Sequence, residues 1–342
     1  MKKIAIILGS IIMAISLALS GQIVYIMLNQ TPVGISDKLS DMNLSVNVML
    51  TRPDNWNKII EAPIIDERDM VIVDGSTATI PITAELLRQF YGYTDNKINQ
   101  NQIVFHSTTH NAYMNLIESG YKSDGINAPI YPVSLIFVTP PSDEEKQLAK
   151  NWNVELDLTP MAKDGFVFIT HKNNPVDSLT VEQIQDIYMG IITNWNQVGG
   201  EDLEIKAYQR EENSGSQTAM EQMVMQGKTI QSPIGVKVHF GMGRLVDAVA
   251  EYENGPASIG YSYYYYINNL YKNENIKVIK INGTAPTNDN LISGAYPFST
   301  NYFAVIRGDE PEDSPARKLR DFLITPQGQN LIAMAGYCKA VN

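Results

Sequence analysis

The sequence contains almost no cysteine and little histidine. Cys338 is the only cysteine among the 342 residues, so no disulfide bond and no cysteine-based metal site can form within the chain. The four histidines lack the spacing of HExxH and of other metal-binding motifs, and we interpret them as packing or surface residues. We therefore expect no metal and no cofactor. The histidines are His106, His110, His171 and His239.

Basic residues are also scarce. The chain has 26 lysines and arginines against 37 aspartates and glutamates, which gives a net charge of −11. A nucleic-acid-binding protein needs a basic surface to neutralise phosphate groups, so this charge argues against nucleic acid as a partner. It does not exclude a small anion, because a few local hydrogen-bond donors can hold one while solvent screens the distant carboxylates.

Charge is nearly absent from the N-terminal segment. Lys2 and Lys3 are the only charged residues among the first 36, and residues 4–28 are almost entirely apolar. A helix of this length, ~37 Å, exceeds the ~30 Å hydrocarbon core of a membrane. The apolar run also continues past Ala18–Ser20, the one plausible cleavage site. We therefore expect residues 1–30 to form an uncleaved signal anchor rather than a cleaved signal.

The location of the chain follows from this segment. The two lysines place the N-terminus in the cytoplasm and the rest of the chain on the extracytoplasmic face of the membrane. A cleaved signal would instead lead to secretion. No cysteine follows the apolar run, which excludes a lipoprotein anchor. Residues 31–65 are polar, contain three prolines and show no sustained period, so we interpret them as a stalk or linker.

Strand patterns alternate with helical patterns from about residue 70. A short apolar strand, a turn and a helix-like stretch follow one another three times, beginning at MVIV, IVF and VSLIFVT. Two further helix patterns, PARKLRDFL and QGQNLIAMAG, lie near the C-terminus. This alternation predicts an α/β fold with a largely parallel sheet.

Three loops place small hydroxyl residues at the start of an expected helix. They are DGSTATIP (74–81), HSTTHNA (106–112) and REENSGSQT (210–218). The free backbone N–H groups and partial positive charge of a helix N-terminus attract an anion, and small residues let it come close. For a single loop, simple N-capping by Ser or Thr is the better explanation. Three such loops together favour an oxyanion pocket.

Arg210 is the only fixed cation in these loops. A guanidinium group can hold an oxyanion through two parallel hydrogen bonds. The same side chain can instead pair with Glu211, Glu212 or another carboxylate, and the spacing does not decide between the two roles.

The stretch from Asp164 to Asn213 resembles the phosphate-binding proteins of bacterial phosphate ABC transporters. In that family's order, it contains a DGFVFI strand, an NNP…LT turn, a helix ending in IYMG, the segment NWNQVGG, and a strand ending in Arg210 before SGS. Farther on, IGYSYYYY and GAYPFSTNYFAVIR resemble two later strands of the family, so the resemblance covers residues 70–338. The motifs are specific as an ordered set, although each is weak alone.

The resemblance implies a two-lobed α/β periplasmic-binding-protein fold, in which the ligand lies in a cleft that closes by hinge motion. The first lobe would comprise residues 66–165 plus 283–342, and the second residues 166–282. The chain would therefore cross the hinge twice.

The resemblance also implies the binding residues. The Arg210 loop matches the family's phosphate-gripping loop, and the other two loops match its first and second phosphate loops. Where the family has an aspartate that accepts the proton of hydrogen phosphate, this sequence has Thr139 or Pro140. Because a threonine hydroxyl both donates and accepts, selectivity between phosphate and sulfate stays open. The implied ligand-binding residues are Thr79, Ile80, Ser107, Thr108, Thr109, Thr139, Arg210, Ser214, Gly215 and Ser216.

The sequence favours a membrane-anchored solute-binding protein that captures phosphate or a related oxyanion for an ABC transporter permease. The alternative is a membrane-anchored surface or sensory module that kept the fold but lost tight phosphate binding. An enzyme is disfavoured, because Ser76 and Ser214 lie outside any GxSxG motif and the sequence places no His–Asp partner beside them. We interpret Tyr261 and Tyr263–Tyr266 as mainly core residues, with lining of the cleft or hinge as the alternative.

Overall fold

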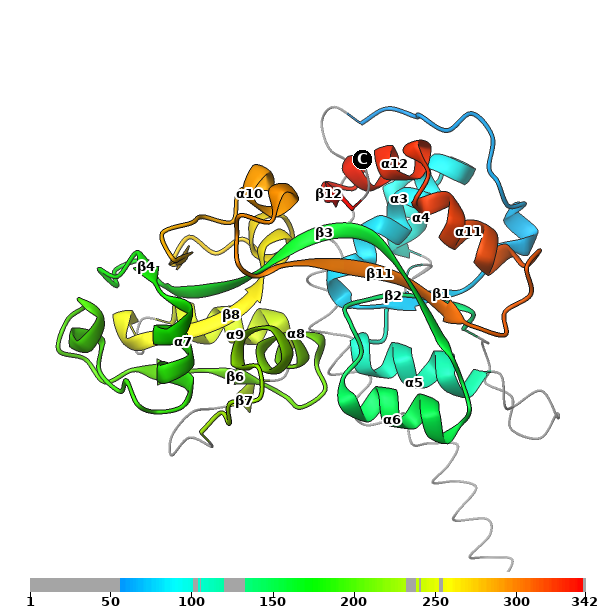
Figure 1. Ribbon diagram of the computed structural model, residues 1–342. Coiled ribbons are helices and arrows are strands. Elements are labelled where there is room, and N and C mark those ends of the chain that lie inside the picture. The colour runs from blue at the N-terminus through cyan, green and yellow to red at the C-terminus, as the bar shows by residue number, and fades with distance from the viewer. Residues whose placement is uncertain are drawn as a thin grey trace, which may run out of the picture. The chain divides into compact units, whose positions relative to one another are not determined.

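A mixed β-sheet runs through the fold, and β3 (Leu156–His171) is the longest of its described strands (Figure 1). The computed structural model describes residues 56–100, 104, 106–119, 133–231, 238–239, 241–251 and 255–340. The described residues all belong to one compact unit, Val48–Asn342. The predicted anchor at residues 1–30 and the predicted stalk up to residue 55 lie outside the described residues.

The strand order of this sheet is β1-β2-β11-β3-β8-β5, and β9 and β12 also pair with β3. The outer pairs β1/β2 and β5/β8 are parallel, whereas β11 is antiparallel to both β2 and β3, and β3 is antiparallel to β8. The prediction of a largely parallel sheet is therefore wrong. Repeated crossover helices produce parallel pairs, but β3 and β11 lie between those pairs as antiparallel strands. The other strands are β1 (Val73–Gly75), β2 (Leu135–Val138), β5 (Lys206–Ala207), β8 (Ser258–Tyr263), β9 (Ile276–Val278), β11 (Ser299–Arg307) and β12 (Cys338–Lys339).

Strand β3 changes its neighbours between Gly165 and Phe166. Its first part, Leu156–Gly165, pairs with β11, and Phe166–Thr170 pairs with β8. The elements gather in two groups along it (Figure 1). We call the group around β1, β2 and the first part of β3 the β2 half, and the group around β8 and the second part of β3 the β8 half.

Helices cover each half. The β2 half contains α3 (Ile80–Tyr91), α4 (Asp95–Gln100), α5 (Thr109–Ser119), α6 (Asp143–Asn151), α11 (Pro315–Leu323) and α12 (Pro326–Met334). The β8 half contains α7 (Val181–Tyr188), α8 (Gly215–Ala219), which continues as a π-helical segment to Met225, and α9 (Met242–Ala250). Helix α10 (Asn288–Ser293) contacts β3, β11 and β12. Two small sheets pair β4 (Ser178–Leu179) with β10 (Lys280–Ile281) and β6 (Gln209–Arg210) with β7 (Val238–His239).

The two C-terminal helices, α11 and α12, each begin with a capping residue followed by a proline. Ser314 and Thr325 cap α11 and α12, and a proline follows each cap at the first helical position. Proline is tolerated at that position because its missing N–H would have no helical partner and its φ already suits the helix. Both helices occur where PARKLRDFL and QGQNLIAMAG predicted them.

Asp164 lies in β3 beside the change of partners and is buried. Its Oδ1 atom accepts hydrogen bonds from the backbone N–H groups of Gly165 at 2.7 Å and Tyr265 at 3.0 Å. Burial raises the pKa of Asp164 to about 7, even though these two hydrogen bonds favour the ionised form. The carboxyl group therefore ties β3 to the segment that follows β8.

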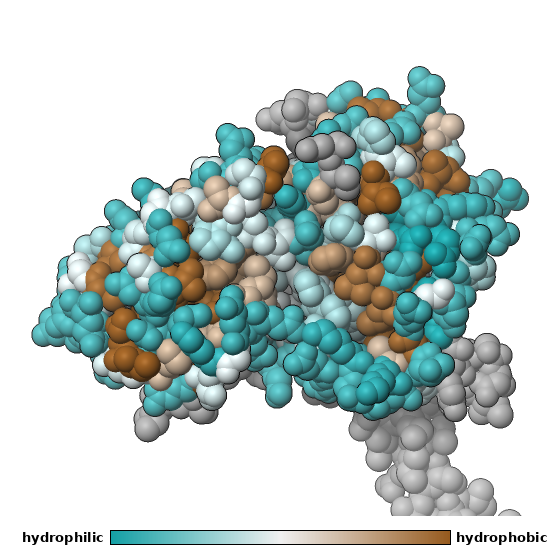
Figure 2. Space-filling model, in the orientation of Figure 1, coloured by the Kyte–Doolittle hydropathy of each residue, from teal (hydrophilic) through white to brown (hydrophobic). Residues whose placement is uncertain are grey.

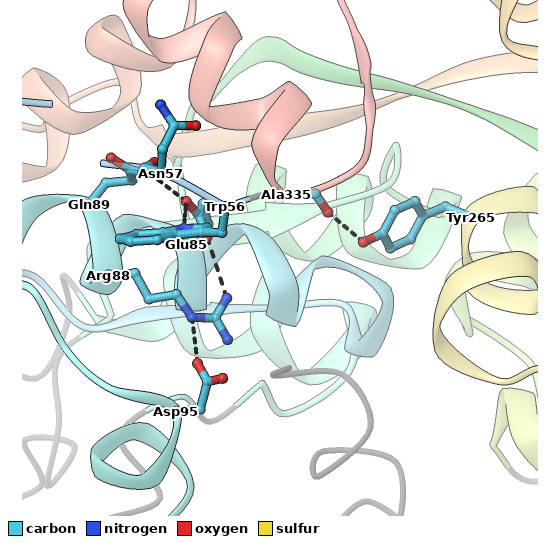
Figure 3. A network of polar contacts seen from close by, with 8 residues as sticks. All are labelled: Trp56, Asn57, Glu85, Arg88, Gln89, Asp95, Tyr265 and Ala335. Carbon is cyan, nitrogen blue, oxygen red and sulfur yellow. Dashed lines mark hydrogen bonds and ion pairs between the residues drawn. The ribbon is translucent and has the colours of Figure 1, made fainter. Parts of the chain in front are cut away.

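The last ten residues of the predicted stalk contact α3. Trp56 Nε1 donates to Glu85 Oε1 at 2.7 Å, and Gln89 Nε2 donates to the Asn57 carbonyl at 2.9 Å (Figure 3). Gln89 Oε1 also accepts from the backbone N–H of Ile59 at 2.8 Å. Ile60, in the same segment, is buried. These bonds satisfy the polar groups that α3 buries here, so the segment is packed on the β2 half.

The face shown in Figure 2 is largely polar. Hydrophilic residues dominate this face, and the hydrophobic ones on it form small groups. Within the described ranges, no helix combines the length and apolarity that a membrane crossing requires. Among the residues that the structure describes, the exposed large hydrophobic side chains are Ile64, Ile72, Ile191, Ile292 and Ile324.

Candidate functional site

The first predicted loop begins at the end of β1, and its polar groups bond both within the loop and to neighbouring segments. Ser76 caps the 3-10 turn Thr77–Thr79, since its Oγ accepts from the Ala78 N–H at 3.3 Å. Thr79 is fully buried, and its hydroxyl lies 2.8 Å from both the Ser76 and Phe137 carbonyl oxygens. The Ile80 N–H donates to the Thr77 carbonyl. Thr79 and Ile80 thus shape the loop here, and their role as ligand donors stays a prediction.

The second loop is fixed by Asp74, which sequence reasoning missed. This buried carboxylate accepts from the Ser107 backbone N–H and hydroxyl, each at 2.6 Å, and from Asn115 Nδ2 at 2.9 Å. The Ser107 hydroxyl proton is therefore directed at Asp74. Asp74 directly precedes Gly75, the last residue of β1. A carboxylate at the end of this strand therefore holds the neighbouring loop in place.

Thr108 adopts a left-handed conformation, with φ of 86°. This conformation is costly for a β-branched residue and persists only when the surroundings enforce it. Asp74 fixes the preceding Ser107, and the Thr108 carbonyl accepts the Ala112 N–H at 2.9 Å to begin α5. The strain places Thr109 at the start of that helix.

His106 connects the first two loops. It is completely buried, with Nδ1 2.8 Å from the Ser76 carbonyl oxygen and Nε2 3.0 Å from Thr83 Oγ1. A carbonyl can only accept, so Nδ1 carries the proton and Nε2 accepts from Thr83. Burial lowers the pKa of His106, which favours this neutral form. Its interpretation as a packing residue holds, but it also joins two loops.

The Arg210 loop contains the pairing that the sequence left open. Arg210 is buried, with Nε 3.0 Å from Glu211 Oε2 and Nη2 2.9 Å from Glu211 Oε1. Burial would raise the pKa of Glu211, but the hydrogen bond and charge of Arg210 outweigh it and lower that pKa. The guanidinium is therefore held in one plane by its neighbouring carboxylate. Its contact with an anion stays a prediction.

Ser214 caps α8, because its Oγ accepts from the Gln217 N–H at 3.2 Å. Gly215 and Ser216 follow as the first residues of the helix and are buried. The N-capping alternative is thus realised at Ser214 as it is at Ser76. Both hydroxyls serve as caps, and His106 contacts the carbonyl of Ser76 rather than its hydroxyl.

Three predicted site residues meet between the two halves. A Cβ atom on Gly215, in the β8 half, would lie 2.5 Å from Thr139 Oγ1 and 2.7 Å from Thr109 Oγ1, both in the β2 half. Thr139 follows β2, and its Oγ1 is buried without a hydrogen bond of standard geometry to any described residue. The start of α8 and two hydroxyl groups therefore converge at one point, where only glycine fits.

Two tyrosines stand behind this point. Tyr261 Oη accepts from the Arg210 N–H at 2.9 Å and donates to Gln217, and Tyr263 Oη donates to the Gly215 carbonyl at 3.1 Å. Burial raises the pKa of both phenols, and the nearby Thr139 hydroxyl opposes the rise at Tyr263. The strand alternation of ASIGYSYYYY was the available signal, because residues 261 and 263 share one face.

Further contacts join the halves at a polar hollow beside the Arg210 loop. Asn213 Nδ2 donates to Glu144 Oε2, and Gln222 Nε2 donates to the Pro141 carbonyl at 3.2 Å. The hollow has a volume of about 500 Å³ and includes four carboxylates. Among the described residues, no group of three or more histidine, cysteine, aspartate or glutamate side chains could hold a metal ion. The carboxylates are Asp143, Glu144, Glu212 and Glu221.

Comparison with known proteins extends over most of the chain. The chain is 26% identical over 281 residues to the phosphate-binding protein PstS of Borreliella burgdorferi, covering 80% of this chain and 90% of that protein. A crystal structure from Clostridium perfringens, described as a phosphate ABC transporter substrate-binding protein with bound phosphate, is similar with a TM-score of 0.57 and 25% identity, covering 79% of this chain and 99% of that one.

A second structure, an ABC-type phosphate transport receptor from Vibrio cholerae, has the same fold, with a TM-score of 0.54, 22% identity and coverage of 78% and 99%. The model of the PBP superfamily domain matches residues 66–325, which is most of the chain. With its mixed α/β sheet shared by two halves, the chain belongs to the PBP superfamily, the periplasmic binding proteins.

Proposed function

We propose that this protein is an extracytoplasmic solute-binding protein that captures phosphate for an ABC transporter. The observation that carries the proposal is the convergence of Gly215 with Thr109 and Thr139 between the two halves. Two hydroxyl groups face a helix start there, which suits a small oxyanion. The relatives described above include phosphate-binding proteins with this fold, and these support phosphate as the anion.

In the proposed site, the anion enters when the two halves move apart, because Gly215 already contacts both hydroxyl groups. Closure then brings the Thr109 and Thr139 hydroxyls, the amides at the start of α8 and the charge of Arg210 to the anion. The proposed halves correspond to residues 66–165 plus 283–342 and residues 166–282. The other proposed ligand residues are Thr79, Ile80, Ser107, Thr108, Ser214 and Ser216.

The remaining parts of the proposal concern the setting of the protein. An N-terminal anchor would hold the binding unit at the extracytoplasmic face, where a transporter permease would receive the anion. No chemical step is proposed, since Ser76 and Ser214 act as helix caps.

One observation favours the second candidate, a surface or sensory module without tight phosphate binding. Glu211 accepts hydrogen bonds from two donors of Arg210, Nε and Nη2. Calorimetric titration of the solubilised protein with phosphate distinguishes the two. Dissociation constants of about 1 μM or lower, near −8 kcal/mol, support the solute receptor. Absence of binding by folded protein contradicts it and favours the module.

A further inference from the structure

We propose that Tyr261 and Tyr263 are positioning residues that hold the Arg210–Gln217 loop in its binding shape. The importance of that loop rests on the proposed function, whereas its attachment to the two phenols can be tested without any ligand. Each acts through a backbone group of the loop.

Tyr261 holds the beginning of the loop. Its hydroxyl accepts the Arg210 N–H at 2.9 Å and donates to the Gln217 side chain, so one phenol bridges residues seven positions apart. Both Arg210 and Gln217 are buried, and Tyr261 is only 1% exposed. Water cannot readily replace the hydroxyl at such a site, and an unpartnered buried N–H is unfavourable.

Tyr263 holds the middle of the loop. Its hydroxyl donates at 3.1 Å to the carbonyl of Gly215, the residue that faces Thr109 and Thr139. The two phenols come from alternate positions of β8, so they emerge on the same side of that strand. The strand therefore presents two fixed hydrogen-bonding groups to the two ends of the Arg210–Gly215 segment.

The support behind the phenols is rigid. Strand β8 is in register with β3, with Phe168 opposite Tyr261 and Phe166 opposite Tyr263. The Phe166 ring centroid lies 5.3 Å from that of Tyr261 and 5.6 Å from that of Tyr263. The Tyr263 ring also lies 5.5 Å from Tyr302 of β11. Aromatic rings at these separations pack favourably and have little freedom to rotate away.

The loop itself has little regular structure to hold it. Strand β6 contributes only Gln209 and Arg210, and Asn213 has a left-handed φ of 60°. Helix α8 is only five residues long before it becomes π-helical at Met220. A short strand and a short helix joined by a strained turn give the backbone few internal hydrogen bonds, so external ones decide its shape.

The test uses Tyr261→Phe and Tyr263→Phe, which remove each hydroxyl and keep each ring. Tyr188→Phe is the matched control, because Tyr188 is a buried phenol of the β8 half whose hydroxyl bonds the Tyr208 carbonyl at 3.2 Å, outside the loop. Amide hydrogen exchange of residues 209–218 is measured first, on the full-length protein without phosphate. Calorimetric titration with phosphate follows.

We expect exchange of the Arg210 amide to accelerate ~10-fold or more in Tyr261→Phe, and loop amides after Gly215 to accelerate in Tyr263→Phe, as expected from losing one buried hydrogen bond. Phosphate affinity should fall ~5–10-fold in each variant, and Tyr188→Phe should change neither the loop exchange rates nor the phosphate affinity. Unchanged loop exchange in both variants would overturn the proposal, whether or not phosphate binds. Wild-type protein that shows no phosphate binding contradicts the proposed function alone, since the exchange result still decides the role of the tyrosines.

Discussion

Replacing Gly215 with alanine should weaken anion binding by blocking the closest approach of the two halves. The new Cβ would lie 2.5 Å from Thr139 Oγ1 and 2.7 Å from Thr109 Oγ1, and real Cβ atoms essentially never come within 3.0 Å of such neighbours. Thr139 is buried at the end of β2, so it has little room to retreat. The simplest relief is for the halves to part.

The size of the effect follows from the cost of overpacking. Inserting a methyl group into a well-packed contact costs about 1–3 kcal/mol, and here only the closed arrangement bears that cost. Phosphate affinity should therefore fall ~5–150-fold, since 1.4 kcal/mol corresponds to a factor of ten. Alanine also has a higher helix propensity than glycine, worth ~0.5–1 kcal/mol within α8. The thermal unfolding temperature should therefore stay level or rise while affinity falls.

The assay combines calorimetric titration with small-angle scattering of the phosphate-saturated protein. A matched comparison places Gly215→Ala in a Thr109→Ala/Thr139→Ala background, where the methyl group no longer meets a hydroxyl and should cost much less. The reasoning is refuted if Gly215→Ala binds phosphate and compacts as the wild type does. It is also refuted if the substitution is equally harmful in both backgrounds.

Three further predictions concern single side chains. Burial raises the pKa of Asp164 to about 7 from its ordinary value of 3.8, so the folded state binds its proton more tightly, and the resulting stability is present below pH 4 and lost as pH rises through 7. Denaturant unfolding at pH 5 and pH 8 should therefore show a fall in the free energy of unfolding of about 2–3 kcal/mol that is missing in Asp164→Asn; equal pH dependence in both proteins contradicts this. Thr139→Asp should raise the phosphate-to-sulfate affinity ratio at least ~10-fold, because a carboxylate accepts the proton of hydrogen phosphate and repels sulfate; an unchanged ratio in competition titrations would place the selectivity elsewhere. Arg210→Ala should weaken phosphate binding by ~2–4 kcal/mol, because a buried charge-assisted contact is lost and Glu211 loses its partner; wild-type affinity in calorimetry would exclude Arg210 from the site.

Local signals in the sequence predicted several elements well. The patterns PARKLRDFL and QGQNLIAMAG predicted α11 and α12, and the helix-like stretch that follows MVIV is α3. The direction of the central strands, parallel or antiparallel, could not be predicted from these local signals. Strand β3 contains 16 residues and serves both halves, but an alternation of strands and helices says nothing about which distant strand lies beside it.

The candidate site was predictable only where it depends on residues that are close together in the sequence. The hydroxyl-rich loops could be read from the sequence, because N-caps and small residues act over a few positions. The contact of Gly215 with Thr109 and Thr139 joins segments more than 70 residues apart and depends on the whole fold. Asp74 and His106 looked ordinary, since their roles arise from loops that only the folded chain brings to them.

Calorimetric titration of the full-length, solubilised protein with phosphate, and then with sulfate, tests the central claim most directly. The account predicts a single phosphate site per chain with a dissociation constant of about 1 μM or lower, and weaker discrimination against sulfate than an aspartate at residue 139 would give. Folded protein that releases no heat with either anion would contradict the account.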